Sequence, residues 1–120
     1  MPDRDPSPFD PAPLRAEVGG DEAVVRDLAR MCLEELPKQL AEIRRAVERN
    51  DSRGLKIAAH ALKGTVANFG AIAVCEAAWR LECLDNDASI AGSDEGFRQL
   101  EHEIHRIEPL LAALSQGGVQ

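Results

Sequence analysis

The residue best suited to chemistry in this sequence is His60, in the middle of a segment with helical spacing over residues 52–69. The unperturbed pKa of a histidine is about 6.5, so an exposed imidazole is largely neutral near pH 7 and a ring nitrogen can act as a nucleophile. Lys63 and Gly64 follow one turn later. A lysine there can offset the charge of an anionic group on the ring, and a missing side chain leaves room for that group to approach. The spacing therefore favours a nucleophilic histidine that handles an anion.

A helix over residues 52–69 would place His60 on its outer surface. At about 100° per residue, the apolar side chains fall within about 50° of one line and His60 lies about 140° away from it. The predicted core face consists of Leu55, Ala58, Ala59, Leu62, Val66 and Phe69. The predicted outer face around His60 consists of Arg53, Lys56, Lys63, Gly64 and Ala67. We therefore expect an exposed imidazole among cations and residues with almost no side chain.

Positive charge is concentrated on this segment. Residues 52–75 contain Arg53, Lys56 and Lys63 and no acidic residue, whereas the whole chain has 14 Lys and Arg against 21 Asp and Glu and a formal net charge of −7. A basic patch on an acidic protein favours an anion site, although Arg53 and Lys56 could equally be ordinary solvated charges. The overall acidity argues against nucleic acid and anionic membranes as partners, because both attract basic proteins.

The rest of the chain is predicted to be helical as well. Aromatic residues make up only 3% of the chain, and the apolar content comes mainly from residue types that suit helices. Helical spacing of apolar residues predicts helices over residues 10–18, 22–50, 52–69, 71–84 and 94–115. Four long amphipathic helices with short connections imply an all-α fold, an antiparallel four-helix bundle with a short extra N-terminal helix.

One domain accounts for the length of 120 residues. We expect a disordered N-terminal tail over residues 1–9, the bundle over residues 10–115 and a loose C-terminal tail over residues 116–120. Residues 85–93 are expected to form a loop, because Asp, Asn, Ser and Gly cluster there.

Two further expectations concern the effect of Pro37 on its helix and the burial of the segment 71–84. Pro37 interrupts the pattern of residues 22–50, which leaves either a kinked helix or two separate helices. The segment 71–84 is apolar around most of its circumference and should be well buried, with Trp79 packing at the edge of the core.

Several classes of protein are disfavoured. The odd set Cys32, Cys75 and Cys83, with no C-x-x-C, predicts reduced and packed thiols. No apolar run approaches the roughly 20 residues that span a bilayer, and the N-terminus lacks the apolar core of a signal peptide, so a cytoplasmic location is expected. Without a P-loop, G-x-G-x-x-G, zinc motif or nucleophile elbow, we expect neither an ATP-binding site nor an autonomous enzyme. The absence of a surplus apolar face favours a monomer.

Residues 60–64 read His-Ala-Leu-Lys-Gly and Gly70 follows, which resembles the H-x-L-K-G-x5-G pattern of histidine phosphotransfer (HPt) domains. The likeness extends over roughly residues 10–115 and includes E-E-L-P at 34–37 and C-E-x-x-x-x-L-E at 75–82. The resemblance implies that His60 accepts a phosphoryl group on Nε2, that Lys63 assists charge neutralisation and that Gly64 provides access. It also places Glu82 where a polar side chain often contacts the other ring nitrogen.

The resemblance further implies a role in a multistep two-component phosphorelay. His60 would accept the phosphoryl group from the aspartyl phosphate of a response-regulator receiver domain and pass it to another receiver, and a hybrid sensor histidine kinase is a further possible partner. No cofactor of the chain itself is expected. The Mg²⁺ ion is expected on the receiver, because no acidic cluster lies beside His60 in the sequence. Both a free-standing protein and a domain of a hybrid kinase fit the sequence.

Three apolar residues near His60 suggest where a partner docks. Ile57, Ala61 and Ala67 could form a small apolar docking surface, or they could be scattered exposed residues. One alternative function is a bundle that binds a receiver without accepting phosphate. Another is a metal-binding bundle that uses His102 and His105, but both lie off the apolar stripe of their helix, which favours a solvated face.

Overall fold

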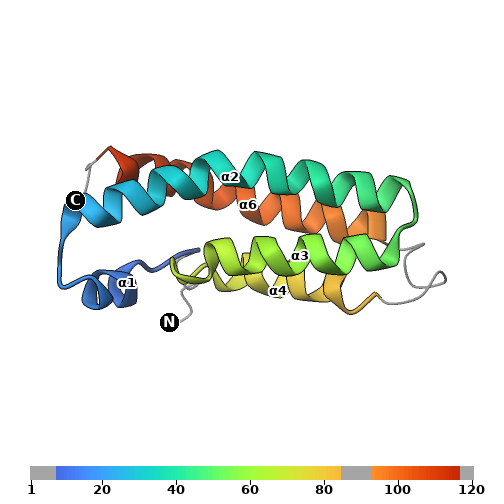
Figure 1. Ribbon diagram of the computed structural model, residues 1–120, viewed down its shortest axis with the longest axis horizontal. Helices are drawn as coiled ribbons and strands as arrows, with labels where there is room; N and C mark the ends of the chain where they lie inside the picture. The colour runs from blue at the N-terminus through green and yellow to red at the C-terminus, as the bar shows by residue number, and fades with distance from the viewer. Residues whose placement is uncertain (1–7, 85–92, 117–120) are drawn as a thin grey trace, which may run out of the picture.

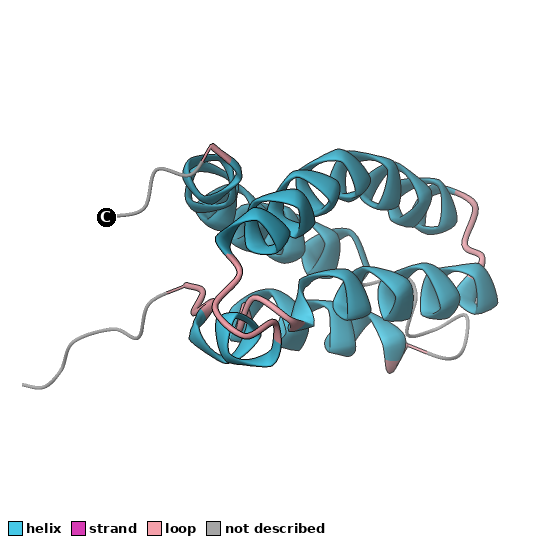
Figure 2. Ribbon diagram, turned by 60° about the vertical axis from the view of Figure 1, so that its left-hand side comes forward, coloured by secondary structure: helices cyan, strands magenta, loops and turns pink. Residues whose placement is uncertain are grey.

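The computed structural model of the protein describes residues 8–84 and 93–116 (Figure 1). These ranges contain helices and turns and no strand (Figure 2). The helices are α1 (Ala12–Glu17), α2 (Glu22–Glu48), α3 (Ser52–Ala67), α4 (Ile72–Glu82) and α6 (Ser93–Ser115). The predicted all-α class is confirmed. The first seven residues of the expected N-terminal tail, most of the expected loop after α4 and the last four residues lie outside the described ranges.

The four long helices form the predicted antiparallel bundle. Helix α2 packs against α3 and α6, and α4 completes the ring by packing against the same two helices. Figure 1 shows α2 beside α6 and α3 beside α4, with the chain reversing direction between successive helices. The short helix α1 packs against α2 at one end. Both parts of the fold prediction, the bundle and the extra N-terminal helix, are confirmed.

Aliphatic stripes hold each helix in one rotation about its axis. On α3 the buried residues are Leu55, Ala58, Ala59, Leu62 and Val66, as predicted. On α6 they include the predicted stripe Phe97, Leu100, Ile104, Ile107, Leu111 and Leu114. Burying one leucine or isoleucine side chain contributes about 1.5–3 kcal/mol, so rotating α3 would expose several such side chains at once. The opposite face of α3, which carries His60, is therefore fixed toward solvent.

A tight turn between α2 and α3 sets where α3 begins. Asn50 adopts a left-handed backbone conformation, with φ of 53°, which asparagine tolerates better than most residues. Asp51 then caps α3, because its carboxylate accepts a hydrogen bond of 2.9 Å from the backbone N–H of Gly54. A Cβ atom at Gly54 would collide with that carboxylate. The glycine therefore allows the cap that fixes the register of α3.

Helix α2 is continuous through Pro37. Of the two alternatives for this proline, the break into two helices is wrong. Proline removes one backbone N–H and crowds the carbonyl four residues earlier, but it leaves the rest of the ladder intact. The neighbouring Leu36 is fully buried, and Cys32 and Ile43 on either side lie in the same core, so packing holds both halves in line.

The ordered chain begins earlier than residue 10, so the predicted boundary of the N-terminal tail is wrong for Phe9. Phe9 is buried, and its ring packs edge-on against Phe69 with the centroids 6.2 Å apart. The backbone N–H of Asp10 donates to the carbonyl of Phe69 at 2.7 Å. Gly70, with φ of 61°, lets the segment before α1 approach the turn after α3, because a Cβ atom at Gly70 would lie 2.7 Å from the carbonyl oxygen of Asp10. One aromatic side chain thus fixes a segment whose composition suggested disorder.

Helix α4 is less buried than its composition predicted. Its core face consists of Val74, Ala77, Ala78 and Leu81. Trp79 lies off that face and is 55% exposed, so its predicted place at the core edge is wrong.

The predicted packing of the thiols is confirmed for Cys32, whose burial raises its pKa to about 12, and is wrong for the exposed Cys83. All three cysteines are free.

None of the described helices combines the length and the apolar character needed to cross a membrane.

Candidate functional site

His60 projects from the outer face of α3, as the sequence predicted. Its side chain is 71% exposed, while Ala59 and Leu62 beside it are fully buried. The residue lies in the middle of a helix whose rotation is fixed by five buried side chains, so the backbone that carries the imidazole is rigid. An exposed ring on a rigid element can meet a macromolecular partner without rearrangement of the fold.

Glu82 approaches His60 from the neighbouring helix α4. Its Oε1 lies 3.2 Å from Nδ1 of His60. The Glu82 side chain is only 14% exposed, so it lies beneath the imidazole rather than beside it in solvent. Because α3 and α4 run antiparallel, a residue in the last turn of α4 meets the middle of α3 (Figure 1).

Lys63 completes this cluster. Its Nζ lies 2.8 Å from Oε2 of Glu82, so the carboxylate contacts both side chains that the motif places one turn apart. Oε2 is buried, and the positive charge of the Lys63 ammonium group beside it compensates its negative charge. Lys63 is also held through its backbone, whose carbonyl accepts a weak hydrogen bond from Sγ of Cys75 at 3.8 Å.

The environment of Glu82 keeps it ionised. Partial burial on its own raises the pKa of Glu82, but the contacts and charges of Lys63 and His60 act in the other direction and together hold its pKa below the usual range. An ionised carboxylate can only accept a hydrogen bond, so the proton shared with His60 belongs to Nδ1. In the neutral imidazole the lone pair is then on Nε2, for which no described residue provides a hydrogen-bond partner. Glu82 therefore favours the tautomer in which Nε2 is the unprotonated nitrogen.

Gly64 lies in open space one turn beyond His60. A Cβ atom at this position would meet no heavy atom within 4 Å. Packing among the described residues therefore gives no reason for a glycine, although a glycine inside a helix costs about 0.5–1 kcal/mol relative to alanine. The open space is compatible with the access role that the family resemblance implies for Gly64, and that role stays a prediction.

The other predicted residues lie on the same outer surface and form no hydrogen bond or ion pair with the side chains of His60, Lys63 or Glu82. Arg53 and Lys56 are exposed and form no ion pair with any described residue. Ile57 is 62% exposed, and Ala61 and Ala67 are exposed as well. The structure thus brings Lys63 and Glu82 into contact with one another at His60, and leaves the remaining candidates as a surrounding surface.

The alternative metal site finds no support in the described part of the chain. His102 and His105 are exposed on α6. Within residues 8–84 and 93–116, no group of three or more His, Cys, Asp or Glu side chains is arranged to hold a metal ion.

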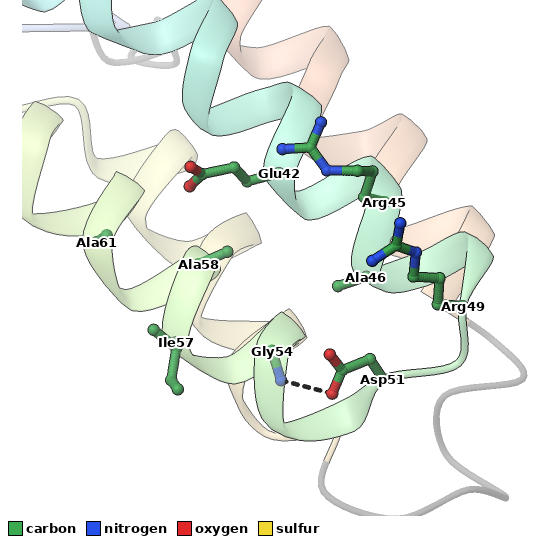
Figure 3. A pocket seen from close by; sticks show the side chains of 9 residues that line it. All are labelled: Glu42, Arg45, Ala46, Arg49, Asp51, Gly54, Ile57, Ala58 and Ala61. Carbon is green, nitrogen blue, oxygen red and sulfur yellow. Dashed lines mark hydrogen bonds between the residues drawn. The ribbon is translucent and has the colours of Figure 1, made fainter.

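Sequence reasoning missed a part of this surface that comes from the C-terminal end of α2. Arg45 of α2 and Arg49, the residue that follows the helix, line one wall of a groove whose other wall includes Ile57 and Ala61 of α3 (Figure 3). The available signal was their spacing of four residues, which places both on one side of the chain just before the turn into α3.

Comparison with known families gives the same identification as the motif. Residues 27–109 match the Hpt domain family. The chain belongs to this family. The matched region begins within α2, ends within α6 and includes the whole cluster of His60, Lys63 and Glu82. No curated protein and no solved structure matches the chain.

Membership of the family defines the general activity. Hpt domains take part in histidine phosphotransfer within two-component phosphorelays, they interact with receiver domains, and they are not kinases. The Hpt domain described here presents one histidine on the outside of its bundle within the H-x-L-K-G segment. The predicted resemblance to this family is confirmed.

Proposed function

We propose that His60 is the phosphoacceptor of this Hpt domain in a multistep phosphorelay. It would accept a phosphoryl group from the aspartyl phosphate of one receiver domain and pass it to another receiver. The observation that carries the proposal is the contact of Nδ1 with Oε1 of Glu82 at 3.2 Å, on a ring that is otherwise 71% exposed. That contact leaves Nε2 as the unprotonated nitrogen, directed at whatever docks on α3.

The proposed transfer exchanges one bond to phosphorus for another. The lone pair of His60 Nε2 forms the N–P bond while the P–O bond to the receiver's aspartate breaks, and the leaving carboxylate takes that electron pair. His60 keeps the proton on Nδ1, so positive charge develops on the ring and is stabilised by the Glu82 carboxylate beneath it. The reverse step hands the phosphoryl group to a second receiver. Positioning and charge supply the catalysis, and the receiver contributes its own Mg²⁺.

Lys63 and Gly64 are proposed to support this step in different ways. Lys63 neutralises Glu82, its partner at 2.8 Å, and so limits the repulsion between that carboxylate and an incoming phosphoryl group. Gly64 leaves space above the ring for the receiver's active site. Arg53 and Lys56 add positive charge at a greater distance, which would attract an acidic partner.

The partner is proposed to dock on the exposed small and apolar residues around His60. These are Ile57, Ala61 and Ala67. The domain is proposed to act as a monomer, since this surface would be covered by a receiver rather than by a second copy. The cytoplasmic location expected from the sequence stays a prediction.

Phosphotransfer from labelled receivers tests the proposal. Receiver domains from the same genome are phosphorylated with Mg²⁺ and a radiolabelled acyl phosphate, freed of the donor and mixed with the protein. We expect rapid labelling of the wild type that is labile to acid and stable to alkali, and none of His60→Gln. The variants His102→Gln and His105→Gln serve as matched controls and should label normally.

Two results would contradict the proposal. Labelling that survives in His60→Gln, with helicity unchanged by circular dichroism, would mean that another residue accepts the phosphoryl group. Tight binding of a receiver to the wild type without any acid-labile phosphate would instead identify a docking module that does not transfer.

A further inference from the structure

Helix α3 has two residues that weaken its backbone directly after Lys63. Gly64 lies inside the helix, where a glycine loses more conformational freedom on folding than any other residue. Thr65 follows, and its Oγ1 donates a hydrogen bond of 3.2 Å to the backbone carbonyl of Ala61. Such a bond to the preceding turn slightly destabilises a helix and often bends it. The turn that follows His60 therefore needs support from the neighbouring helices.

Two thiols contact the backbone on either side of Gly64. Sγ of Cys75, on α4, donates to the carbonyl of Lys63 at 3.8 Å. Sγ of Cys32, on α2, donates to the carbonyl of Thr65 at 3.9 Å. A backbone carbonyl has two lone pairs, so it can accept such a bond in addition to a bond of the helix ladder. The residues immediately before and after the glycine are thus each tied to a different helix.

The surroundings of the two thiols keep them protonated. Cys32 is only 3% exposed, and its burial raises its pKa to about 12. Burial also raises the pKa of Cys75, although the nearby charge of Lys63 acts in the other direction. Only the protonated thiol has a hydrogen to donate, so both cysteines act as donors near pH 7. Cys83, in contrast, is exposed and forms no hydrogen bond with any other described residue.

Helix α4 holds Lys63 at both of its ends. Cys75 contacts its backbone carbonyl, and Glu82 contacts its ammonium group at 2.8 Å. Cys75 and Glu82 are seven residues apart, which places them on one side of α4 about two turns from each other. The carboxylate that Lys63 reaches is the one that orients the ring of His60. A movement of the backbone at Gly64 would therefore be passed to the imidazole through Lys63 and Glu82.

We infer that Cys32 and Cys75 are positioning residues of the His60 site, whose thiols hold the turn around Gly64 so that Lys63 keeps its place on Glu82. The inference rests on the proposed function, because the site that they position is the one proposed to accept the phosphoryl group. Hydrogen bonds from a thiol are weak, and each changes an equilibrium by roughly two- to fivefold. The two thiols act on adjacent parts of one turn, so their effects should combine.

Replacing Cys75 tests the inference without a receiver. Cys75→Ala removes the donor, whereas Cys75→Ser keeps a donor of similar size at the same place. Cys83→Ala is the matched control, because it removes a thiol from the end of the same helix. Amide hydrogen exchange at residues 64–68 reports how often the turn opens. We expect exchange in Cys75→Ala to be faster by roughly two- to fivefold, and exchange in Cys75→Ser and the control to match the wild type.

Phosphotransfer from a receiver that labels wild-type His60 gives the second readout. The rate at saturating receiver should fall by roughly two- to fivefold in Cys75→Ala, with KM unchanged, because the docking surface is intact. Cys75→Ser should restore the rate. The pair Cys32→Ala and Cys32→Ser should behave in the same way, and urea unfolding of each variant shows that the folded protein is being compared. Cys75 is only partly buried, so its pair stays informative if the core position Cys32 tolerates neither change.

The outcomes separate this inference from the proposed function. Exchange or saturating transfer in Cys75→Ala equal to the wild type would overturn the inference, while labelling of wild-type His60 would leave the proposed function standing. An equal loss in Cys75→Ser would overturn it too, because side-chain packing rather than the donor would then be responsible. Failure of every receiver to label the wild type, with the expected difference in exchange between Cys75→Ala and Cys75→Ser, would overturn the proposed function and leave the thiols as supports of the His60 cluster.

Discussion

Nδ1 of His60 lies 3.2 Å from Oε1 of Glu82, although 22 residues and a change of helix separate the two in the chain. The contact depends on the antiparallel packing of α3 and α4, and it leaves most of the imidazole open to solvent. A partly buried carboxylate beneath an exposed ring fixes both the rotation of the ring and the nitrogen that carries the proton. Lys63 holds the second oxygen of the same carboxylate at 2.8 Å, so the orientation of His60 depends on two other side chains, one from each of the two helices.

The first prediction concerns the tautomer of His60. Removing the carboxylate in Glu82→Ala should release the Nδ1 proton, so that the neutral ring becomes a mixture of both tautomers. Nitrogen-15 NMR of the imidazole measures this directly, and His102, which has no hydrogen-bond partner among the described side chains, provides a reference in the same spectrum. Loss of a hydrogen bond to a charged group costs about 1.5–3 kcal/mol, so transfer should slow by roughly 10–100-fold.

The conservative variant Glu82→Gln separates positioning from charge. Its amide oxygen can still accept from Nδ1, so the tautomer should stay close to that of the wild type while transfer is slowed by the lost charge. An unchanged tautomer in Glu82→Ala would show that the ring is oriented by something other than this carboxylate.

The second prediction is a dependence of stability on pH. Lys63 and His60 hold the pKa of Glu82 below its usual range in the folded protein, against the opposing effect of burial. In the unfolded chain its pKa is the ordinary value of about 4.3, so between the two values the unfolded chain binds more protons and stability rises with pH. The contribution of Glu82 is therefore complete above about pH 4.3 and is lost as the pH falls through the folded value.

Urea unfolding at pH 7 and at several values below pH 4 measures this effect. The free energy of unfolding of Glu82→Gln should fall less on acidification than that of the wild type, because the variant has no proton to take up at this position. Glu76→Gln, an exposed glutamate on the same helix, is the matched control and should follow the wild type. Parallel pH profiles for Glu82→Gln and the wild type would contradict the lowered pKa.

The sequence predicted those features of the site that depend on one helix alone. The apolar stripe of α3 has a single period, and it correctly placed Leu55 and Leu62 inside and His60 outside. The contact of Glu82 with His60 depends on how two helices face each other, and α4 is apolar around most of its circumference. The spacing of apolar residues therefore did not predict which face of α4 is exposed. For this reason Trp79 was placed wrongly, and Glu82 was suggested only by the family resemblance.

Other errors arose where the prediction relied on local composition and a few specific contacts in the folded protein override it. Phe9 lies in a stretch rich in Pro and Asp, yet its ring packs on Phe69 and orders the chain before α1. Pro37 is a strong helix breaker by propensity, but buried neighbours on both sides keep α2 continuous. Arg45 was not predicted because the basic segment identified around His60 lies on α3, whereas Arg45 lies on α2 and faces α3 only across the groove between the two helices.

The last prediction concerns the space next to His60. A Cβ atom at Gly64 meets nothing within 4 Å, so Gly64→Ala and Gly64→Gln should both fold and should raise the free energy of unfolding by about 0.5–1 kcal/mol through helix propensity. Transfer should respond in the opposite direction. The methyl group of alanine should slow it slightly and the long side chain of glutamine strongly, because the latter can lie over Nε2 one turn away. Urea unfolding and transfer from a phosphorylated receiver measure the two effects on the same samples, and Ala41→Gln on the exposed surface of α2 controls for the added amide. Transfer to Gly64→Gln at the wild-type rate would mean that the open space is not the route by which the phosphoryl group reaches the ring.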